Sequence, residues 1–190
     1  LSEAILLRLL RETHRPYIIG TSYNSRGFGW IKDRINGINR AAKGMPWLVM
    51  TDLDQEECPP IILRSWLRNE KHPNLIFRIA VREVEAWLLG SRSALAKFVG
   101  VEEHRIQTSV EQIDDPKQYL INLVRRSPKK DLREDIVPRT NLATKGPDYN
   151  GRLAQYVQKY WDPAEAQENS PSLRKAIRAL QEFKPCYESS

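Results

Sequence analysis

Two aspartates separated by one residue, Asp52 and Asp54, follow an apolar run at residues 47–50. Such a run, directly after a proline, predicts a short strand buried on both faces. In a parallel α/β sheet the carboxyl ends of the strands face the ligand-binding crevice, so both aspartates should lie at that edge. Their carboxylates would point the same way and repel, unless a hard cation such as Mg²⁺ lay between them. The alternative is a solvated turn, in which aspartate is common.

A second acidic pair, Glu83 and Glu85, follows the next predicted strand, at residues 75–80. Residues 81–89 have the pattern of a helix, in which positions two apart are turned by about 200°. Only one of the two glutamates can then face the site. We favour Glu85, with Glu83 as its substitute. The alternative for either is an acid of the first helical turn that interacts with the helix dipole.

Basic residues in three segments are candidates for contact with phosphate. Arg26 lies in a loop with two glycines and two aromatics, but the spacing matches no phosphate-cradle motif, so an ordinary strand-to-helix loop fits at least as well. Lys145 precedes Gly-Pro, a turn that would position a lysine to stabilise phosphoryl charge. Lys129 and Lys130 belong to a mixed-charge run, which is usually solvated surface but is also suited to binding a nucleic-acid backbone.

The composition sets limits on the class of protein. The 190 residues suit one domain or a core with an appended lobe, and the net charge of +6 favours a polyanionic partner. No apolar run has the length of a membrane span and no signal peptide opens the sequence, so we expect a cytoplasmic protein without membrane contact. Cys58 and Cys186 are isolated, which argues against a zinc site or a disulfide framework. No Walker A motif is present, so any use of ATP requires a partner.

The hydrophobic pattern predicts the elements that must position these residues. Helices are expected at residues 1–12, 30–43, 61–69, 81–89, 93–99, 116–126, 150–161 and 171–183, and strands at 17–19, 47–50 and 75–80. Strand signals fade after Ser91, which divides the chain into an α/β core at residues 1–90 and a mainly helical lobe at residues 91–190, packed on the core. An opening helix normally follows a strand in such folds, so we expect a first strand upstream of Leu1.

Two strands that end in acidic pairs, with helices between them, resemble the Toprim fold. This is the metal-binding α/β domain shared by topoisomerases, bacterial primases and the overcoming-lysogenisation-defect nucleases. The segments at residues 81–89, 145–150, 161–163 and 170–173 are similar to a bacterial family of Toprim-like proteins, often encoded beside an ABC or AAA ATPase in anti-phage defence loci. The likeness covers most of the chain and implies a mostly parallel sheet flanked by helices.

The resemblance also implies roles for particular residues. Asp52 and Asp54 would be metal ligands, Glu85 or Glu83 a further acid, and Lys145 a cation that stabilises the transition state. The expected activity is cleavage of phosphodiester bonds in DNA or tRNA with Mg²⁺ or Mn²⁺, with an ABC- or AAA-type ATPase as partner. The alternative is a non-catalytic regulatory or sensor subunit of such an ATPase complex. The choice between DNA and RNA, the trigger and self-association are left open by the sequence.

The sequence departs from the family pattern at two places. A Toprim glutamate at the end of the first strand has no counterpart, because Glu3 matches only the second acid of the family's opening motif. Gly90 and Ser91 stand where similar sequences have an acid after the paired leucines. Both departures bear on whether the acidic centre is complete.

Overall fold

Two parallel strands, β1 (Trp47–Asp52) and β2 (Leu75–Ala80), form the sheet in the part of the chain that the structure describes. The structure is a computed structural model, and it describes residues 1–23, 28–53, 59–140 and 142–187. Trp47 pairs with Leu75 and Asp52 with Ala80, so the two strands begin and end at the same level. The parallel register therefore brings both carboxyl ends to one edge, as the sequence predicts.

Helices account for the other regular elements. Before the sheet and between its strands lie α1 (Ser2–Glu12), α2 (Phe28–Ala41) and α3 (Pro59–Trp66). After it come α4 (Val84–Gly90), α5 (Arg92–Val99), two short 3₁₀ turns η1 (Glu103–Arg105) and η2 (Val110–Gln112), α6 (Pro116–Arg125), α7 (Lys130–Ile136), α8 (Tyr149–Lys159), α9 (Pro163–Asn169) and α10 (Pro171–Glu182). Within the described residues, no helix combines the length and apolar character that crossing a bilayer requires.

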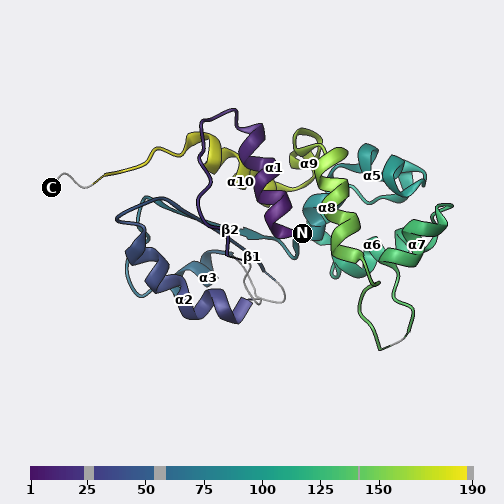
Figure 1. The fold of residues 1–190 in the computed structure, drawn as a ribbon, viewed down its shortest axis with the longest axis horizontal. Helices are drawn as coiled ribbons and strands as arrows, with labels where there is room; N and C mark the ends of the chain where they lie inside the picture. Colours follow the sequence, from purple (N-terminus) through teal and green to yellow (C-terminus); the bar gives the residue numbers. More distant parts are fainter. Residues whose placement is uncertain (24–27, 54–58, 141, 188–190) are drawn as a thin grey trace.

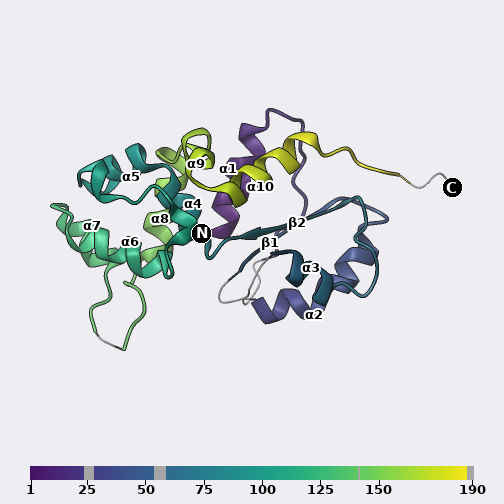
Figure 2. The same ribbon diagram turned by 180° about the vertical axis from the view of Figure 1, so that it is seen from behind.

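The sheet is covered on both faces. On one face α2 and α3 pack through Ile35 and Ile62 against Phe77 of β2. On the other face α1 and α10 lie over the sheet, and Ile5 belongs to the same apolar cluster as Ile76 (Figures 1 and 2). Burial on both faces explains why the strands read as continuous apolar runs rather than as alternating patterns.

The second half of the chain forms a helical lobe beside the sheet (Figure 1). Every residue of α4 is buried, and α4 lies at the centre of the lobe. The indole of Trp87 donates to Ser172 Oγ at 2.8 Å, and the indole of Trp161 donates to the carbonyl of Trp87 at 3.1 Å. After the lobe, α10 returns to pack against β2, so residues on both sides of position 90 contribute to the layers around the sheet.

The structure bears out an α/β class with parallel strands, but a larger Toprim-like sheet is not found among the described residues. The strand expected at residues 17–19 is absent, because this segment forms no ladder with β1 or β2 and Ile18 is 97% exposed. Tyr17 instead donates its hydroxyl to the Leu180 carbonyl, and Arg15 donates to the Gln181 carbonyl at 2.7 Å. The segment is thus fastened to the last turn of α10.

Two helices, α7 and α9, were not expected from the pattern. The run that contains α7 is rich in charge, and only Leu132 and Ile136 are buried from it, which gives a weak apolar stripe. The sequence does indicate the start of α9, because Asp162 is followed by proline. In the structure Asp162 accepts hydrogen bonds from the backbone N–H groups of Ala164 and Glu165. Aspartate before proline is a favoured helix start.

Candidate functional site

Asp52, the last residue of β1, is hydrogen-bonded to the first residue of α4. Its Oδ1 accepts a hydrogen bond from the backbone N–H of Val84 at 2.9 Å. The N–H of Leu53 reaches the carbonyls of Ala80 and Arg82, at 2.9 and 3.0 Å, and holds the two chain segments together. Val84 is one of the helix-start residues whose N–H has no partner within the helix. The Asp52 carboxylate therefore caps α4 from the neighbouring strand.

Glu83 precedes α4 and is not helical. Its backbone is extended, with φ −136° and ψ 161°. The prediction of a helix over residues 81–89 is therefore wrong for its first three residues, and the helical angle between Glu83 and Glu85 does not apply. Both oxygens of the Glu83 carboxylate are engaged by Lys117, which donates from its backbone N–H at 3.0 Å and from its Nζ at 2.6 Å.

Glu85 is buried in the first turn of α4, with 3% of its surface exposed. Its Oε1 accepts a hydrogen bond from the hydroxyl of Tyr149 at 2.9 Å. Burial raises the pKa of the Glu85 carboxyl, because desolvation disfavours its charged form, while the nearby Lys117 charge opposes this change. Burial and the adjacent Glu85 charge also raise the pKa of the Tyr149 hydroxyl, which keeps it a donor.

Asp52, Glu83 and Glu85 form an acidic group at the carboxyl edge of the sheet. Lys117 is the main positive charge of this acidic group, and the sequence analysis did not identify it. Burial acts to lower its pKa, but the hydrogen bond to Glu83 and the charges of Glu85, Glu83 and Asp52 raise it overall. The ammonium thus supplies counter-charge to Asp52, Glu83 and Glu85. A signal was present, because a lysine in the first turn of a helix is unfavourable with the helix dipole and needs a local reason.

Lys145 lies close to this group through Tyr149. Its Nζ is 6.0 Å from the centre of the Tyr149 ring, and the side chain is exposed. The following turn is fixed against the end of α7, where Gly146 donates to the Ile136 carbonyl at 2.9 Å. A Cβ on Gly146 would lie 2.3 Å from the Asp135 carbonyl oxygen, so only glycine fits. The tight turn predicted around Lys145 is present.

The other predicted basic residues lie elsewhere or outside the described residues. Lys129 donates its Nζ to the carbonyls of Lys97 and Phe98, at 2.9 and 2.6 Å, and so caps the end of α5. Lys130 is exposed and forms an ion pair with Glu134. Arg26 and Asp54 are not among the residues that the structure describes.

A hollow of about 300 Å³ on the helical lobe carries a basic group that the sequence reading did not single out. Arg125, Arg133 and Arg139 line it, together with Glu134. Three guanidinium groups at one concave surface suit contact with phosphate groups. This hollow is a better candidate than Lys129 for contact with the phosphate backbone of a nucleic acid.

Gly90 and Ser91, the second departure from the Toprim-like pattern, are held by packing and hydrogen bonds. Gly90 lies against α9, where an added Cβ would be 2.7 Å from the Ala166 carbonyl oxygen. Ser91 donates from Oγ to Glu165 Oε2 at 2.9 Å, and the same carboxylate accepts from the Ser93 N–H at 2.7 Å. Glu165 therefore caps α5, and this pair of residues has a structural role.

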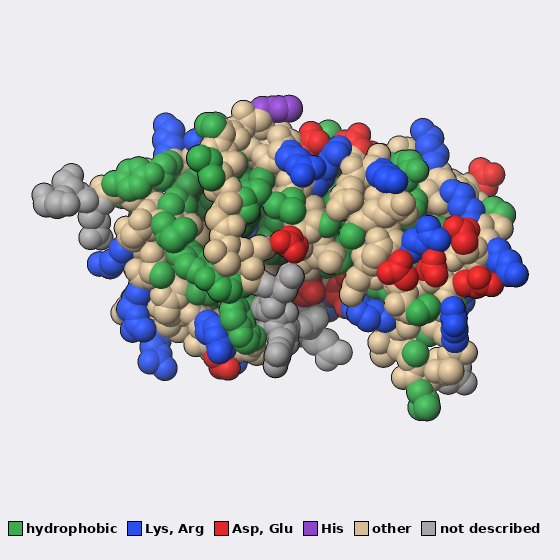
Figure 3. Space-filling model, in the orientation of Figure 1, with side chains coloured by type: hydrophobic (Ala, Val, Ile, Leu, Met, Phe, Trp, Pro, Cys, Tyr) green, Lys and Arg blue, Asp and Glu red, His purple; other side chains and the backbone are tan. Residues whose placement is uncertain are grey.

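The described residues fit a divalent cation only if the protein supplies few of its ligands and the rest of its coordination shell is open. No group of three or more His, Cys, Asp or Glu side chains among them is arranged to hold a metal ion. Glu83, Glu85 and Asp52 all accept hydrogen bonds within the protein, and Asp52 is the one of the three at the end of a strand. Mg²⁺ commonly takes one or two carboxylates and completes its shell with water and phosphate oxygens. Figure 3 shows acidic side chains on the face between the sheet and the helical lobe.

No family model, no curated protein and no solved structure matches this chain. Fold and site together define an α/β protein with a small parallel sheet, a helical lobe, and an acidic group with a central lysine at the carboxyl edge of the strands.

Proposed function

We propose that the chain cleaves phosphodiester bonds of nucleic acid at the carboxyl edge of the sheet, with Mg²⁺ or Mn²⁺, and that it acts with an ATPase partner in anti-phage defence. The observation that carries the proposal is the Asp52–Val84 hydrogen bond, because it places the end of β1 against the segment that bears Glu83 and Glu85. The net charge of +6 and the three-arginine hollow support attraction of a polyanion.

Asp52 and Asp54 are the residues that would hold the cation. A bound divalent cation supplies charge neutralisation at the phosphate and makes attacking water more acidic. The Val84 N–H holds the Asp52 carboxylate in place at the end of β1. Lys117 limits repulsion among the carboxylates, and Lys145 adds exposed positive charge near the Tyr149 ring.

The test is cleavage of plasmid, single-stranded DNA and tRNA in the presence of Mn²⁺. The best single variant is Asp52→Asn, because the amide oxygen still accepts from Val84 while the negative charge is lost. This variant and the double variant Asp52→Ala, Asp54→Ala should lose cleavage of all three substrates. Asp114→Asn is the matched control, since the Asp114 side chain is 97% exposed. Cutting by the double variant at the wild-type rate would refute the proposal.

A second candidate is a non-catalytic subunit that docks on an ATPase as sensor or regulator. It is favoured by the internal engagement of the acids, since both Glu83 oxygens accept from Lys117 and Glu85 is buried against Tyr149. Calorimetry with Mg²⁺ and Mn²⁺ separates the two functions. Binding that is lost in Asp52→Asn supports the nuclease, and absence of binding in the wild type supports the regulator.

A further inference from the structure

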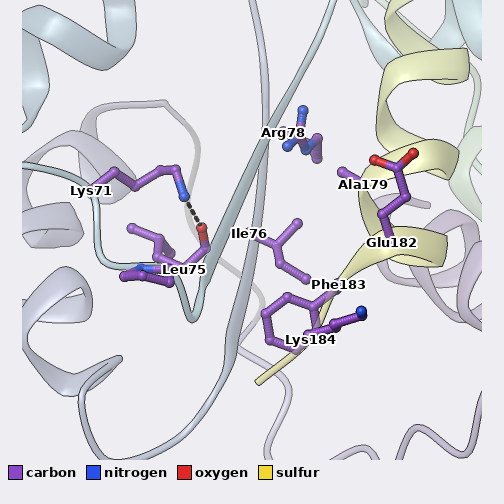
Figure 4. A pocket seen from close by; sticks show the side chains of 9 residues that line it. Lys71, Leu75, Ile76, Arg78, Ala179, Glu182, Phe183 and Lys184 are labelled. Atoms are coloured by element: carbon purple, nitrogen blue, oxygen red, sulfur yellow. Dashed lines mark hydrogen bonds between the residues drawn. The ribbon is translucent and has the colours of Figure 1, made fainter. Parts of the chain in front are cut away.

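A cavity of about 270 Å³ lies between β2 and the end of α10, away from the carboxyl edge of the strands (Figure 4). Lys71, Arg78 and Lys184 line it, and Glu182 is its acidic member. Three positive charges thus face one negative charge at a concave site. None of these residues belongs to the acidic group around Asp52.

Arg78 is the central residue of this cavity. It stands in β2 between Ile79 and Phe77, and Figure 4 shows its side chain between the strand and α10. Its Nε is buried and donates to no acceptor, and no hydrogen bond or ion pair of the guanidinium is found among the described residues. Burial lowers the pKa of this group. Arg78 is half-buried, and a buried guanidinium N–H without an acceptor is costly, since such groups are normally paired.

Lys71 adds a second positive charge instead of an acceptor. Its Nζ donates to the Leu75 carbonyl at 2.8 Å. Burial lowers its pKa, and the Arg78 charge lowers it further, so the two cations disfavour each other. Glu182 does not relieve this, because its carboxylate accepts from Arg178. An anion is the component that would satisfy both cations.

We propose that this cavity binds a phosphate oxyanion. Guanidinium and ammonium groups together match the several acceptor oxygens and multiple negative charge of phosphate. The volume admits a phosphate together with part of the group that carries it, and Ile76 and Phe183 are apolar residues of the lining. The source is either a phosphorylated small molecule or the backbone of a nucleic acid. The inference does not depend on the proposed cleavage at Asp52.

The test measures binding to the full chain at constant ionic strength by calorimetry and by NMR amide shifts. The probes are inorganic phosphate, adenosine 5′-monophosphate, and a single-stranded oligonucleotide without terminal phosphate. At least one should bind the wild type and shift the amides of residues 71–78 and 179–184. Arg78→Gln should weaken that binding by about tenfold or more, the usual effect of losing a charge-assisted hydrogen bond. Arg40→Gln, on the exposed part of α2, should bind as the wild type.

A second variant protects the test against misfolding. Lys184→Gln changes an exposed residue beyond α10 and should weaken the same probe severalfold without affecting the fold. Response to phosphate or the nucleotide identifies a small-molecule source, and response to the oligonucleotide alone identifies a backbone source. The assignment would be overturned if none of the three probes bound the wild type. It would also be overturned if Arg78→Gln and Lys184→Gln both bound the probe as tightly as the wild type, or if acetate bound as tightly as the phosphate-bearing probe.

Discussion

The hydroxyl of Tyr149 donates to Oε1 of Glu85 over 2.9 Å and links the first residue of α8 to the first turn of α4. Both side chains are buried, with 1% of Tyr149 and 3% of Glu85 exposed. The same Tyr149 ring faces the ammonium of Lys145. This bond therefore connects the interior of the helical lobe to the acidic group at the sheet edge.

Removing the Tyr149 hydroxyl should destabilise the protein. Tyr149→Phe keeps the ring but leaves the Glu85 oxygen without its donor, which costs about 1–3 kcal/mol for a buried polar group. Urea unfolding followed by tryptophan fluorescence measures the loss. Tyr160→Phe is the control, because Tyr160 is 54% exposed and should change the free energy of unfolding little. Equal values for the two variants would mean that the Tyr149–Glu85 bond contributes nothing.

Glu85 should make stability depend on pH. Its folded pKa is raised above the ordinary value of 4.5, so the folded protein binds this proton more tightly than the unfolded chain. The stabilisation is present below the ordinary pKa and is lost as the pH rises through the folded pKa. The free energy of unfolding of wild type should therefore fall relative to Glu85→Gln across that range. The free energy of unfolding of Glu134→Gln, changed at an exposed site, should follow the same pH dependence as that of the wild type. A wild-type free energy of unfolding that rises with pH relative to Glu85→Gln would contradict the raised pKa.

Local patterns predicted that the end of β1 meets the segment after β2, because the relevant constraint is short in range. The apolar runs fixed both strands, and parallel strands of equal length end at one level, which brings Asp52 to the segment after Ala80. The partner of Glu83 was not predictable in this way. Lys117 is brought in by α6, from a helix whose packing depends on contacts distant in the sequence.

The strand expected at residues 17–19 illustrates a different limit. An apolar Tyr-Ile-Ile run has strand propensity, but a strand exists only where a partner offers its backbone groups. In this chain Tyr17 and Arg15 bond instead to the carbonyls at the end of α10, a contact that no local pattern encodes. Tertiary contact therefore decided the state of this segment.

Lys117→Met should destabilise the acidic group and increase its response to divalent cations. The variant removes the 2.6 Å hydrogen bond from Nζ to Glu83 and also the positive charge among three acids. The cost should be about 1–3 kcal/mol. If Lys117 holds the place of a counter-ion, Mg²⁺ should raise the melting temperature of the variant more than that of wild type. Lys130→Met is the control, since Lys130 is exposed. An identical Mg²⁺ response in all three proteins would show that the ammonium does not compensate the acids.

The turn after Lys145 should tolerate no side chain at Gly146. In Gly146→Ala the new Cβ would meet the Asp135 carbonyl oxygen at 2.3 Å and the Ile136 carbonyl carbon at 2.5 Å, both in the backbone, so the turn must move away from α7. Overpacking of this kind costs about 1–3 kcal/mol or more, and it should also displace Tyr149 from Glu85. Gly37→Ala is the matched control, because Gly37 lies within α2 with nothing within 4 Å of an added Cβ. That variant should gain about 0.5–1 kcal/mol, since alanine favours the helix. Thermal unfolding of both variants checks the contrast, and a Gly146→Ala protein as stable as Gly37→Ala would show that the turn does not pack against α7.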